Sequence, residues 1–220
     1  MELGTKEEWD EAAAGVSERE TVFLRKVRLW LDSSDFALRR KKEWRNKKGP
    51  MFSYKENHPA QRYMMLSDGK TRIRRLWGGF SPKVYDSDST LQILPPLAER
   101  LKGVDLIADN HFLSTAKALA GRICIHAPTA ERDRSETEFD EETIRTGVGL
   151  SFPTREESQR NASIRHLRSP VERPFGKLKT LFKCFKPYWP GNPERQNKAV
   201  YFACGVHNWR IDNMHLLSPQ

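Results

Sequence analysis

The chain has 220 residues, of which 37% are hydrophobic and 10% aromatic, enough apolar material for a buried core. It carries 38 Lys and Arg against 29 Asp and Glu, and this net charge of +9 favours a polyanionic partner such as nucleic acid. No run approaches about 18 apolar residues, which excludes a transmembrane helix, and the acidic start is typical of neither a signal peptide nor a transit peptide.

Strand and helix signals alternate along the chain. Apolar stretches predict strands, Asp68-Gly69 marks a hairpin turn between two of them, and apolar residues at helical spacing predict helices. The expected strands are 27–31, 53–54, 62–66, 71–77, 104–108 and 122–126. The expected helices are 90–101, 114–120, 171–185 and 194–209, with a short helix starting near Trp9. This order predicts an α/β fold with a central mixed sheet of about five strands flanked by helices.

Charge falls in blocks that suggest how the chain is divided. Residues 37–48 carry seven basic side chains and one acid, and residues 155–186 carry nine basic side chains and three acids. Between them, residues 131–142 carry seven acids and two arginines. We expect an acidic N-terminal extension (1–26), one main domain (27–211) with a polar, loop-like insertion (128–158), and a short tail (212–220).

Three carboxylates lie where such a fold places functional groups. Asp32 and Asp109 each follow an apolar strand, and α/β sheets gather functional residues at the carboxyl ends of strands. Glu172 lies at the head of the predicted 171–185 helix, beside its apolar stripe. Clustered carboxylates need cations, and their oxygens suit Mg²⁺ or Mn²⁺. A pair of such ions about 3.5–4 Å apart is a standard device for cutting phosphodiester bonds.

Each carboxylate also has a structural interpretation. Asp32 and Asp109 fit solvated turn or cap residues. Glu172 fits the third position of a capping box that begins at Ser169, with Pro170 at the first helical position.

Further candidates are weaker. His111 lies two residues from Asp109, and Asp86 and Asp88 form a local acidic pair that also suits a helix N-terminus. The six histidines show no metal-ligand spacing, and the sequence holds no nucleotide-binding or serine-hydrolase motif. The three cysteines are far apart with no Cys-x-x-Cys pair. This argues against a disulfide framework and a cysteine-based zinc site, and indicates a reducing compartment.

Several segments together resemble the catalytic domain of DDE transposases of the PIF/Harbinger type. They are LWLDSSDF (29–36), the stretch 52–89 with its Asp-Ser element, VDLIADNHF (104–112), RHLRSPVERPFGKLKTLFK (165–183) and ACGVHNWRI (203–211). The resemblance covers about residues 27–211, and the order and spacing of the segments are more specific than any one of them. It implies a ribonuclease H-like fold and metal-dependent DNA cleavage and strand transfer.

Carried over residue by residue, the resemblance places the catalytic, metal-binding acids on Asp32, Asp109 and Glu172, with two Mg²⁺ or Mn²⁺ ions as cofactors. Asp35 is the alternative to Asp32, because the motif contains both. Asp86 and His111 remain additional candidates. We expect phosphate contacts from the two basic blocks: Arg39, Arg40, Lys41 and Lys42 in the first, and Arg168, Arg173, Lys177 and Lys179 around Glu172. Residues 39–48 alternatively form a nuclear localisation signal or a solvated loop.

The resemblance also implies partners. The substrate is double-stranded DNA at transposon ends, in the nucleus. Members of the family usually carry a helix-turn-helix domain or borrow one, and only about 26 residues precede the first strand here. We therefore expect a separate DNA-binding partner protein, no membrane and a possible homodimer. Two other functions stay open: a non-catalytic, domesticated transposase-derived nuclear binding protein, and a ribonuclease H-like nuclease that acts on RNA or hybrids.

Overall fold

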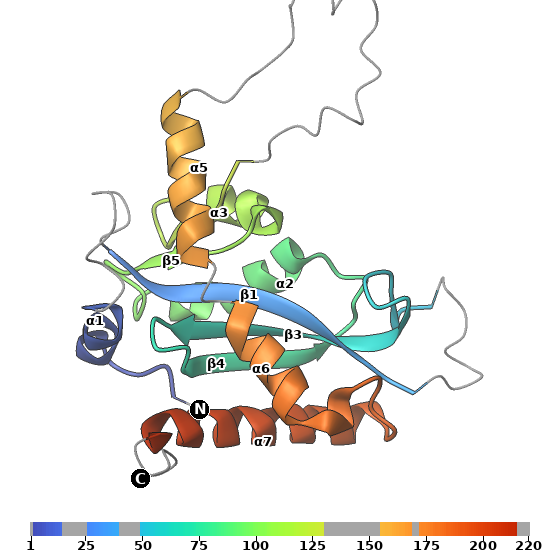
Figure 1. Ribbon diagram of the computed structural model, residues 1–220. Coiled ribbons are helices and arrows are strands. Elements are labelled where there is room, and N and C mark those ends of the chain that lie inside the picture. Colours follow the sequence, from blue (N-terminus) through green and yellow to red (C-terminus); the bar gives the residue numbers. More distant parts are fainter. Residues whose placement is uncertain (1, 15–25, 40–48, 130–154, 169–171, 215–220) are drawn as a thin grey trace, which may run out of the picture.

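The computed structural model describes residues 2–14, 26–39, 49–129, 155–168 and 172–214 (Figure 1). A twisted sheet forms its centre. Its strands are β1 (Val27–Ala37), β2 (Phe52–Ser53), β3 (His58–Asp68), β4 (Ile73–Phe80), β5 (Asp105–Ile107) and β6 (Cys124–His126). β3 pairs antiparallel with β1 and with β4, whereas β5 and β6 continue the sheet parallel to β1. The order β4-β3-β1-β5-β6, with short β2 added to β3, is that of a ribonuclease H-like α/β fold.

Helices cover both faces of this sheet. They are α1 (Lys6–Ala14), α2 (Asp86–Ile93), α3 (Leu113–Ala118), α5 (Arg155–Arg168), α6 (Glu172–Leu181) and α7 (Pro193–Asp212). Short 3-10 turns lie at η4 (Pro95–Leu97), η5 (Asn110–Phe112) and η6 (Lys183–Phe185). None of the described helices is both long and apolar enough to cross a membrane.

Successive side chains of β1 point to opposite faces of the sheet, so they belong to separate apolar clusters. Leu29 and Leu31 point to one side, where they pack with Met64 and Leu66 of β3 and with the segment that carries α2 and α3. Leu3 and Trp9 join this cluster, so the α1 segment is packed onto the domain. On the opposite face, other apolar residues of β1 pack with residues of the C-terminal helices.

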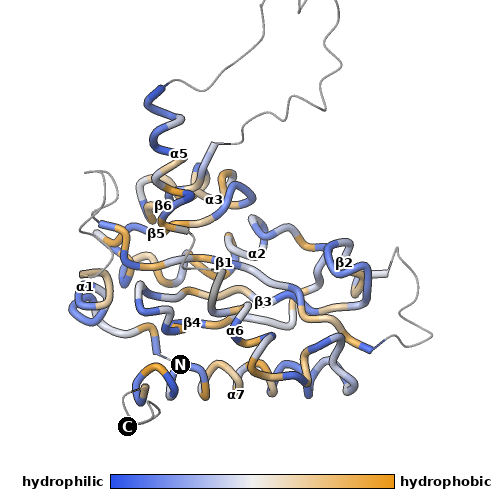
Figure 2. Tube along the Cα trace, viewed as in Figure 1, coloured by the Kyte–Doolittle hydropathy of each residue, from blue (hydrophilic) through white to orange (hydrophobic). Residues whose placement is uncertain are grey.

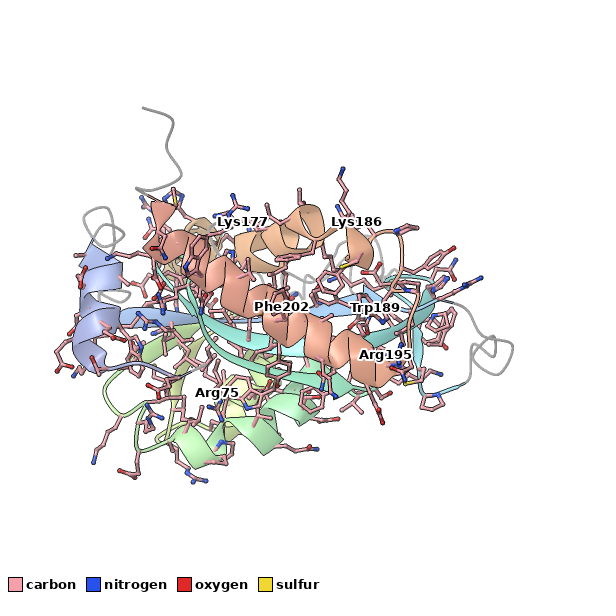
Figure 3. The ribbon with its side chains drawn as sticks, turned by 90° about the horizontal axis from the view of Figure 1, so that it is seen from below. Arg75, Lys177, Lys186, Trp189, Arg195 and Phe202 are labelled. Atoms are coloured by element: carbon pink, nitrogen blue, oxygen red, sulfur yellow. The ribbon has the colours of Figure 1, made fainter. Side chains whose placement is uncertain are left out.

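Trp30 and Phe36 lie on this second face. Trp30 contacts Ile164 of α5 in one cluster, and Phe36 packs with Phe175 of α6 in another. α7 runs along the same side, and its buried Val200 belongs to the Phe36 cluster (Figure 1). The outward face of α7 carries exposed side chains, including Phe202, which Figure 3 shows from below.

Several of the expected elements are confirmed. The β3–β4 hairpin turns after Asp68, whose side chain accepts hydrogen bonds from the backbone N–H groups of Lys70 and Arg72. The apolar stripe of the predicted 171–185 helix is buried at Phe175, Leu178 and Phe185, but the helix itself ends at Leu181, and Phe185 belongs to the 3-10 turn η6. Trp30 is a core residue, Trp77 packs at the edge of the core, and Trp44 lies outside the described residues.

Three sequence predictions are wrong in their boundaries. The first strand does not end at Leu31 but runs to Ala37, because its backbone pairs with β3 as far as Ala60. The predicted 90–101 helix begins earlier, at Asp86, and ends at Ile93, because Pro95 and Pro96 cannot continue its hydrogen bonding.

The third error concerns the predicted loop at 128–158, which overlaps the start of a helix. α5 begins at Arg155, and among its described side chains Ile164 and Leu167 join the apolar cluster on the sheet. Its first turns are hydrophilic on every side and extend away from the sheet (Figure 2). Residues 130–154 lie outside the described part of the chain.

Candidate functional site

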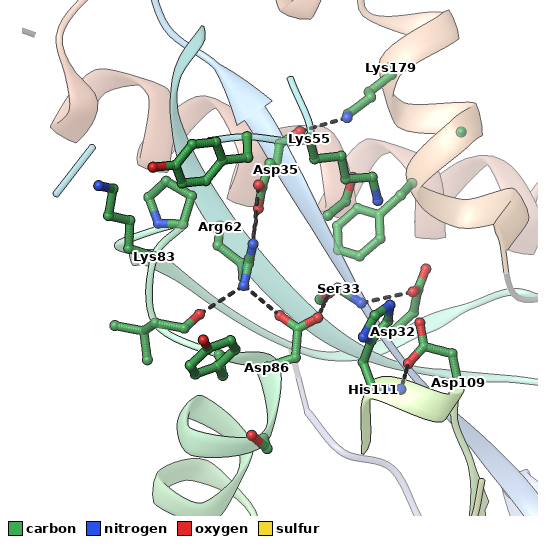
Figure 4. A pocket seen from close by; sticks show the side chains of 18 residues that line it. Asp32, Ser33, Asp35, Lys55, Arg62, Lys83, Asp86, Asp109, His111 and Lys179 are labelled. Carbon is green, nitrogen blue, oxygen red and sulfur yellow. Dashed lines mark hydrogen bonds and ion pairs between the residues drawn. The ribbon is translucent and has the colours of Figure 1, made fainter. Parts of the chain in front are cut away.

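A cavity of about 910 Å³ opens on the side of the sheet where β1 extends beyond β5 (Figure 4). Its walls come from six segments of the chain. They are residues 32–35 of β1, Tyr54 and Lys55 between β2 and β3, Arg62 of β3, residues 82–87 leading into α2, Asp109 and His111 after β5, and α6. The cavity therefore contains most of the acids singled out in the sequence, together with several basic side chains.

Asp32 and Asp109 occupy matching positions on two adjacent parallel strands. Trp30 of β1 is paired with Ile107 of β5, and each aspartate lies two residues beyond this pair. Because side chains alternate along a strand, both aspartates continue the side of the sheet that carries Trp30 and Ile107. Both are half-buried and line the cavity. The structure thus brings together the first two carboxylates predicted from the sequence.

Backbone N–H groups orient both carboxylates. Asp109 caps η5, and its Oδ1 accepts a hydrogen bond from the backbone N of His111 at 2.9 Å. Oδ1 of Asp32 accepts one from the backbone N of Ser33 at 2.8 Å. The cap interpretation of Asp109 is therefore confirmed, and it coexists with a position on the cavity wall. His111 is exposed and reaches the cavity beside Asp109.

The third predicted acid, Glu172, is the first residue of α6. The structure describes its place in the helix but not its side chain. Phe175, Gly176 and Lys179 of the same helix line the cavity. They follow Glu172 by three, four and seven residues, which is the spacing of one helical face. The backbone thus places Glu172 one turn before the part of α6 that forms the cavity wall.

Arg62 of β3 binds two of the carboxylates that line the cavity. Its Nε lies 2.7 Å from Oδ1 of Asp35, and its Nη1 lies 2.8 Å from the carbonyl oxygen of Val84 and 2.9 Å from Oδ1 of Asp86. Asp86 also accepts a hydrogen bond of 2.8 Å from the Ser33 hydroxyl. Burial alone would lower the pKa of Arg62, but the bonds and charges of Asp35 and Asp86 raise it above its ordinary value.

Asp35 differs sharply from Asp32. Its side chain is only 2% exposed, and Oδ2 accepts a hydrogen bond of 2.6 Å from the Ser53 hydroxyl in addition to its contacts with Arg62. Both oxygens are therefore committed to protein partners. Asp86 is likewise paired with Arg62 and Ser33, so Arg62 neutralises part of the acidic charge of these two carboxylates.

Three lysines border the cavity. Nζ of Lys179 donates to the carbonyl oxygen of Asp35 at 2.6 Å and to Oε1 of Glu56 at 3.1 Å. Lys55 is exposed, and Lys83 lies over the ring of Tyr54 at 5.5 Å. The cavity thus has a carboxylate wall, with Asp32 and Asp109, and a lysine-bearing wall, with Lys55, Lys83 and Lys179.

The other basic residues predicted from the sequence lie elsewhere or outside the description. Arg39 is exposed at the end of β1, and Arg40, Lys41 and Lys42 lie outside the described residues. The side chains of Arg168 and Arg173 are not described either. Lys177 is exposed on α6, does not line the cavity, and its charge acts on His207 of α7.

Sequence reasoning missed three cavity residues, namely Lys55, Arg62 and Lys83. Arg62 carried a usable signal, because it interrupts the otherwise buried run of β3 and needs a buried partner there. Lys55 and Lys83 carried none, because single lysines in turns are common on any surface. Their position becomes meaningful only when the loops that hold them meet at the cavity.

The donors of the carboxylate wall suit hard divalent cations. Carboxylate oxygens on the half-buried Asp32 and Asp109 are the ligands that Mg²⁺ and Mn²⁺ prefer. Among the described side chains, these two with His111 do not form a cluster of three close ligands. A complete metal site here therefore needs a further carboxylate, and α6 begins with one.

Comparison with known proteins agrees with this geometry. The sequence model of the DDE superfamily endonucleases matches residues 31–208, a range that contains Asp32, Asp109 and Glu172. No curated protein and no solved structure matches the chain. A match over most of the chain, together with a ribonuclease H-like sheet and paired aspartates at its cavity, shows that the chain belongs to the DDE superfamily endonucleases.

Proposed function

We propose that this chain is the catalytic domain of a metal-dependent DNA endonuclease of the transposase kind, in which Asp32, Asp109 and Glu172 hold two Mg²⁺ or Mn²⁺ ions. One observation carries the proposal. Asp32 and Asp109 lie side by side on one wall of a large cavity, and α6, which begins at Glu172, forms another wall. The family match supports nuclease chemistry at this site.

The contacts of Asp35 support Asp32 as the first ligand. A carboxylate held by Arg62 on both oxygens and by Ser53 would have to lose these bonds before it could bind a cation. Asp86 is also paired, by an ion pair of its Oδ1 with Arg62 and a hydrogen bond of its Oδ2 from Ser33. We therefore assign Asp35 and Asp86 to the support of the cavity rather than to metal binding.

The acids and the lysines of the cavity have different roles in the proposed phosphodiester cleavage. When bound, the two ions supply activation of the attacking oxygen and stabilisation of the leaving oxygen. Asp32 and Asp109, each oriented by a backbone N–H, hold their carboxylates in place before the substrate arrives. Lys55 and Lys83, on the other wall, bind backbone phosphates and offset their repulsion from the acids.

The substrate that fits this division is duplex DNA. A cavity with acids on one side and lysines on the other accepts a phosphate backbone without reading bases. We further propose that the protein works in the nucleus and that a separate DNA-binding partner recognises the sequence. A homodimer would present two such cavities to two DNA ends.

A nicking assay tests the proposal. Supercoiled plasmid is incubated with the full chain and Mg²⁺ or Mn²⁺, and conversion to open circles is followed on gels. We expect Asp32→Asn, Asp109→Asn and Glu172→Gln each to lower the rate at least about 100-fold, because each change removes a charged metal ligand. Asp88→Asn, an acid of α2 that does not line the cavity, is the matched control. Nicking that persists in all three variants would exclude the assignment.

One observation favours a second, non-catalytic function. Asp109 has a structural task as the cap of η5, and it would be retained for that task in a domesticated binding protein. In that case the chain binds duplex DNA but does not cut it with either metal, and Asp109→Asn lowers the stability of the fold. Duplex, hybrid and RNA substrates, compared side by side, test the remaining alternative of a nuclease for RNA.

A further inference from the structure

A second group of metal-ligating side chains lies on β5 and on the neighbouring strand β6. Asp105 begins β5, and Cys124 and His126 lie on the neighbouring edge strand β6. Asp105 and Asp109 are four residues apart, which corresponds to about 13 Å along an extended chain. None of Asp105, Cys124 and His126 lines the cavity, so the group is separate from the proposed cleavage site.

Strand geometry brings these three side chains together. Cys124 and His126 are two residues apart, so they share one face of β6, and Cys124 is paired with Asp105 in the parallel register. Nε2 of His126 lies 2.8 Å from Oδ2 of Asp105 and 3.6 Å from Sγ of Cys124. Within the described part of the chain, this is the one group of three or more such ligands whose atoms all lie within 4.8 Å of one another.

One of the ligand distances already matches an edge of a tetrahedral zinc site, and the others lie within reach of one. Bond lengths of about 2.3 Å to sulfur, about 2.0–2.1 Å to nitrogen and about 2.0–2.2 Å to oxygen require ligand atoms roughly 3.4–3.6 Å apart. The sulfur–nitrogen distance already has this value. The nitrogen–oxygen distance is shorter because the two groups are hydrogen-bonded, and it must open by about 0.6 Å.

The donor chemistry selects the metal. A thiolate, an imidazole and a carboxylate form a mixed set that Zn²⁺ accepts and that Mg²⁺ does not, because Mg²⁺ prefers oxygen. Partial burial and the neighbouring carboxylate of Asp105 raise the pKa of the Cys124 thiol to about 11, so a metal ion must displace the thiol proton when it binds. The resulting thiolate and the carboxylate carry two negative charges, which balance a divalent ion. Asp105 and His126 have side chains only 14% exposed, whereas Cys124 is exposed, so the fourth position faces solvent.

We propose that Asp105, Cys124 and His126 form a binding site for one Zn²⁺ ion that fastens the edge strand β6 to β5. The sequence argued against a cysteine-based zinc site because it has no Cys-x-x-Cys pair. A Cys-x-His pair on a strand, facing an Asp on the next strand, escapes that criterion. The edge strand has only three paired residues with β5, so a cross-link there has a direct effect on stability.

Zinc binding to the full, tag-free chain tests the proposal. The protein is treated with a chelator, desalted and titrated with Zn²⁺ against a chromophoric competitor at fixed pH. We expect one tight site, which Cys124→Ser and His126→Gln each weaken at least about 100-fold, because each removes a ligand. Cys184→Ser, which removes an exposed thiol elsewhere, is the matched control and must bind zinc as the wild type does.

Two further measurements separate this site from the cavity and from misfolding. Co²⁺ in place of Zn²⁺ should give thiolate-to-cobalt absorption that is lost in Cys124→Ser and retained in Asp32→Asn. Zn²⁺ should raise the melting temperature of the wild type but not of Cys124→Ser, whose metal-free melting temperature should equal that of the wild type. Zinc affinity unchanged in Cys124→Ser, or binding no tighter than that of any exposed thiol, would leave only a hydrogen-bonded Asp105–His126 pair and overturn the proposal.

Discussion

Arg62 binds both carboxylate oxygens of Asp35, with Nε 2.7 Å from Oδ1 and Nη2 3.2 Å from Oδ2. The pair is almost wholly buried, with side chains 15% and 2% exposed. It fastens β1 to β3 at the back of the cavity, while Asp32, three residues earlier on β1, remains on the cavity wall. Two aspartates of one motif thus have opposite roles, and their substitutions should differ in kind.

The first prediction concerns these two aspartates. Asp35→Asn leaves Arg62 as a buried charge without its main partner, so it should lower the free energy of unfolding by about 3 kcal/mol or more. Asp32→Asn should change that free energy by less than about 1 kcal/mol, while nicking falls at least about 100-fold. Urea denaturation and plasmid nicking measure the two effects. A stable, inactive Asp35→Asn beside an active Asp32→Asn would reverse the assignment.

The second prediction concerns the lysine-bearing wall. Lys55→Gln and Lys83→Gln should each weaken binding to duplexes of unrelated sequence by a similar factor, because phosphate contacts carry no sequence information. Each change should also reduce the slope of log K against log salt by about 0.9. Fluorescence anisotropy at several NaCl concentrations, with Ca²⁺ present to prevent cleavage, measures both. Lys102→Gln, exposed and away from the cavity, should leave the slope unchanged.

The third prediction uses two glycines with different surroundings. A Cβ on Gly78 of β4 would overlap the ring of Tyr63, which is fully buried on β3. Gly78→Ala should therefore destabilise the protein by about 1–3 kcal/mol. A Cβ on Gly205, in the middle of α7, meets nothing within 4 Å, so Gly205→Ala should stabilise the helix by about 0.5–1 kcal/mol. Chemical denaturation of both variants should give effects of opposite sign.

The fourth prediction is a pH dependence of stability. Burial lowers the pKa of His207 below 6.5, aided by the charges of Lys177 and Arg210 and opposed by its hydrogen bond to the carbonyl oxygen of Thr71. The folded state then binds fewer protons than the unfolded state between the two pKa values. The contribution of neutral His207 to the free energy of unfolding is complete above about pH 6.5 and is lost as the pH falls through the pKa of the folded state.

Replacement of His207 tests this dependence. His207→Gln keeps a donor for the Thr71 carbonyl but does not titrate, so its free energy of unfolding should fall less steeply below pH 6.5 than that of the wild type. Urea denaturation in a pH series measures the two slopes. Equal slopes in the wild type and the variant would show that other groups control the acid sensitivity.

The order of strands and helices was predictable because local signals agreed with the final packing. Asp68-Gly69 indicated the hairpin, and the apolar stripe that includes Phe175 and Leu178 indicated α6. The end of β1 was not predictable, because Asp32-Ser33-Ser34-Asp35 is polar on both sides and resembles a loop. These residues stay in a strand because their backbone pairs with β3. Their polar side chains find hydrogen-bond partners beside the cavity, such as Arg62 for Asp35 and Asp86 for Ser33.

The sequence predicted only those site residues whose position in a strand or helix is itself typical of a functional role. Asp32 and Asp109 follow apolar strands, and the parallel register then determines that they meet. Arg62 and the two lysines were not found, because their partners come from segments distant in sequence. α5 was missed for a related reason: only Ile164 and Leu167 give it an apolar side, and its first half has none.

The unequal lengths of two neighbouring strands have one more consequence. β1 has eleven residues and β5 has three, so beyond Trp30 β1 is still paired with β3 along one edge but no longer with β5 along the other, and residues 32–35 there line the cavity. The cavity opens where β5 ends, and the register between β1 and β5 determines that Asp32 and Asp109 lie at matching positions beside it. Two residues added to β5 would displace Asp109 from Asp32 by roughly 7 Å without altering a single acid. Strand length, as much as side-chain identity, therefore decides whether this sheet can gather its carboxylates.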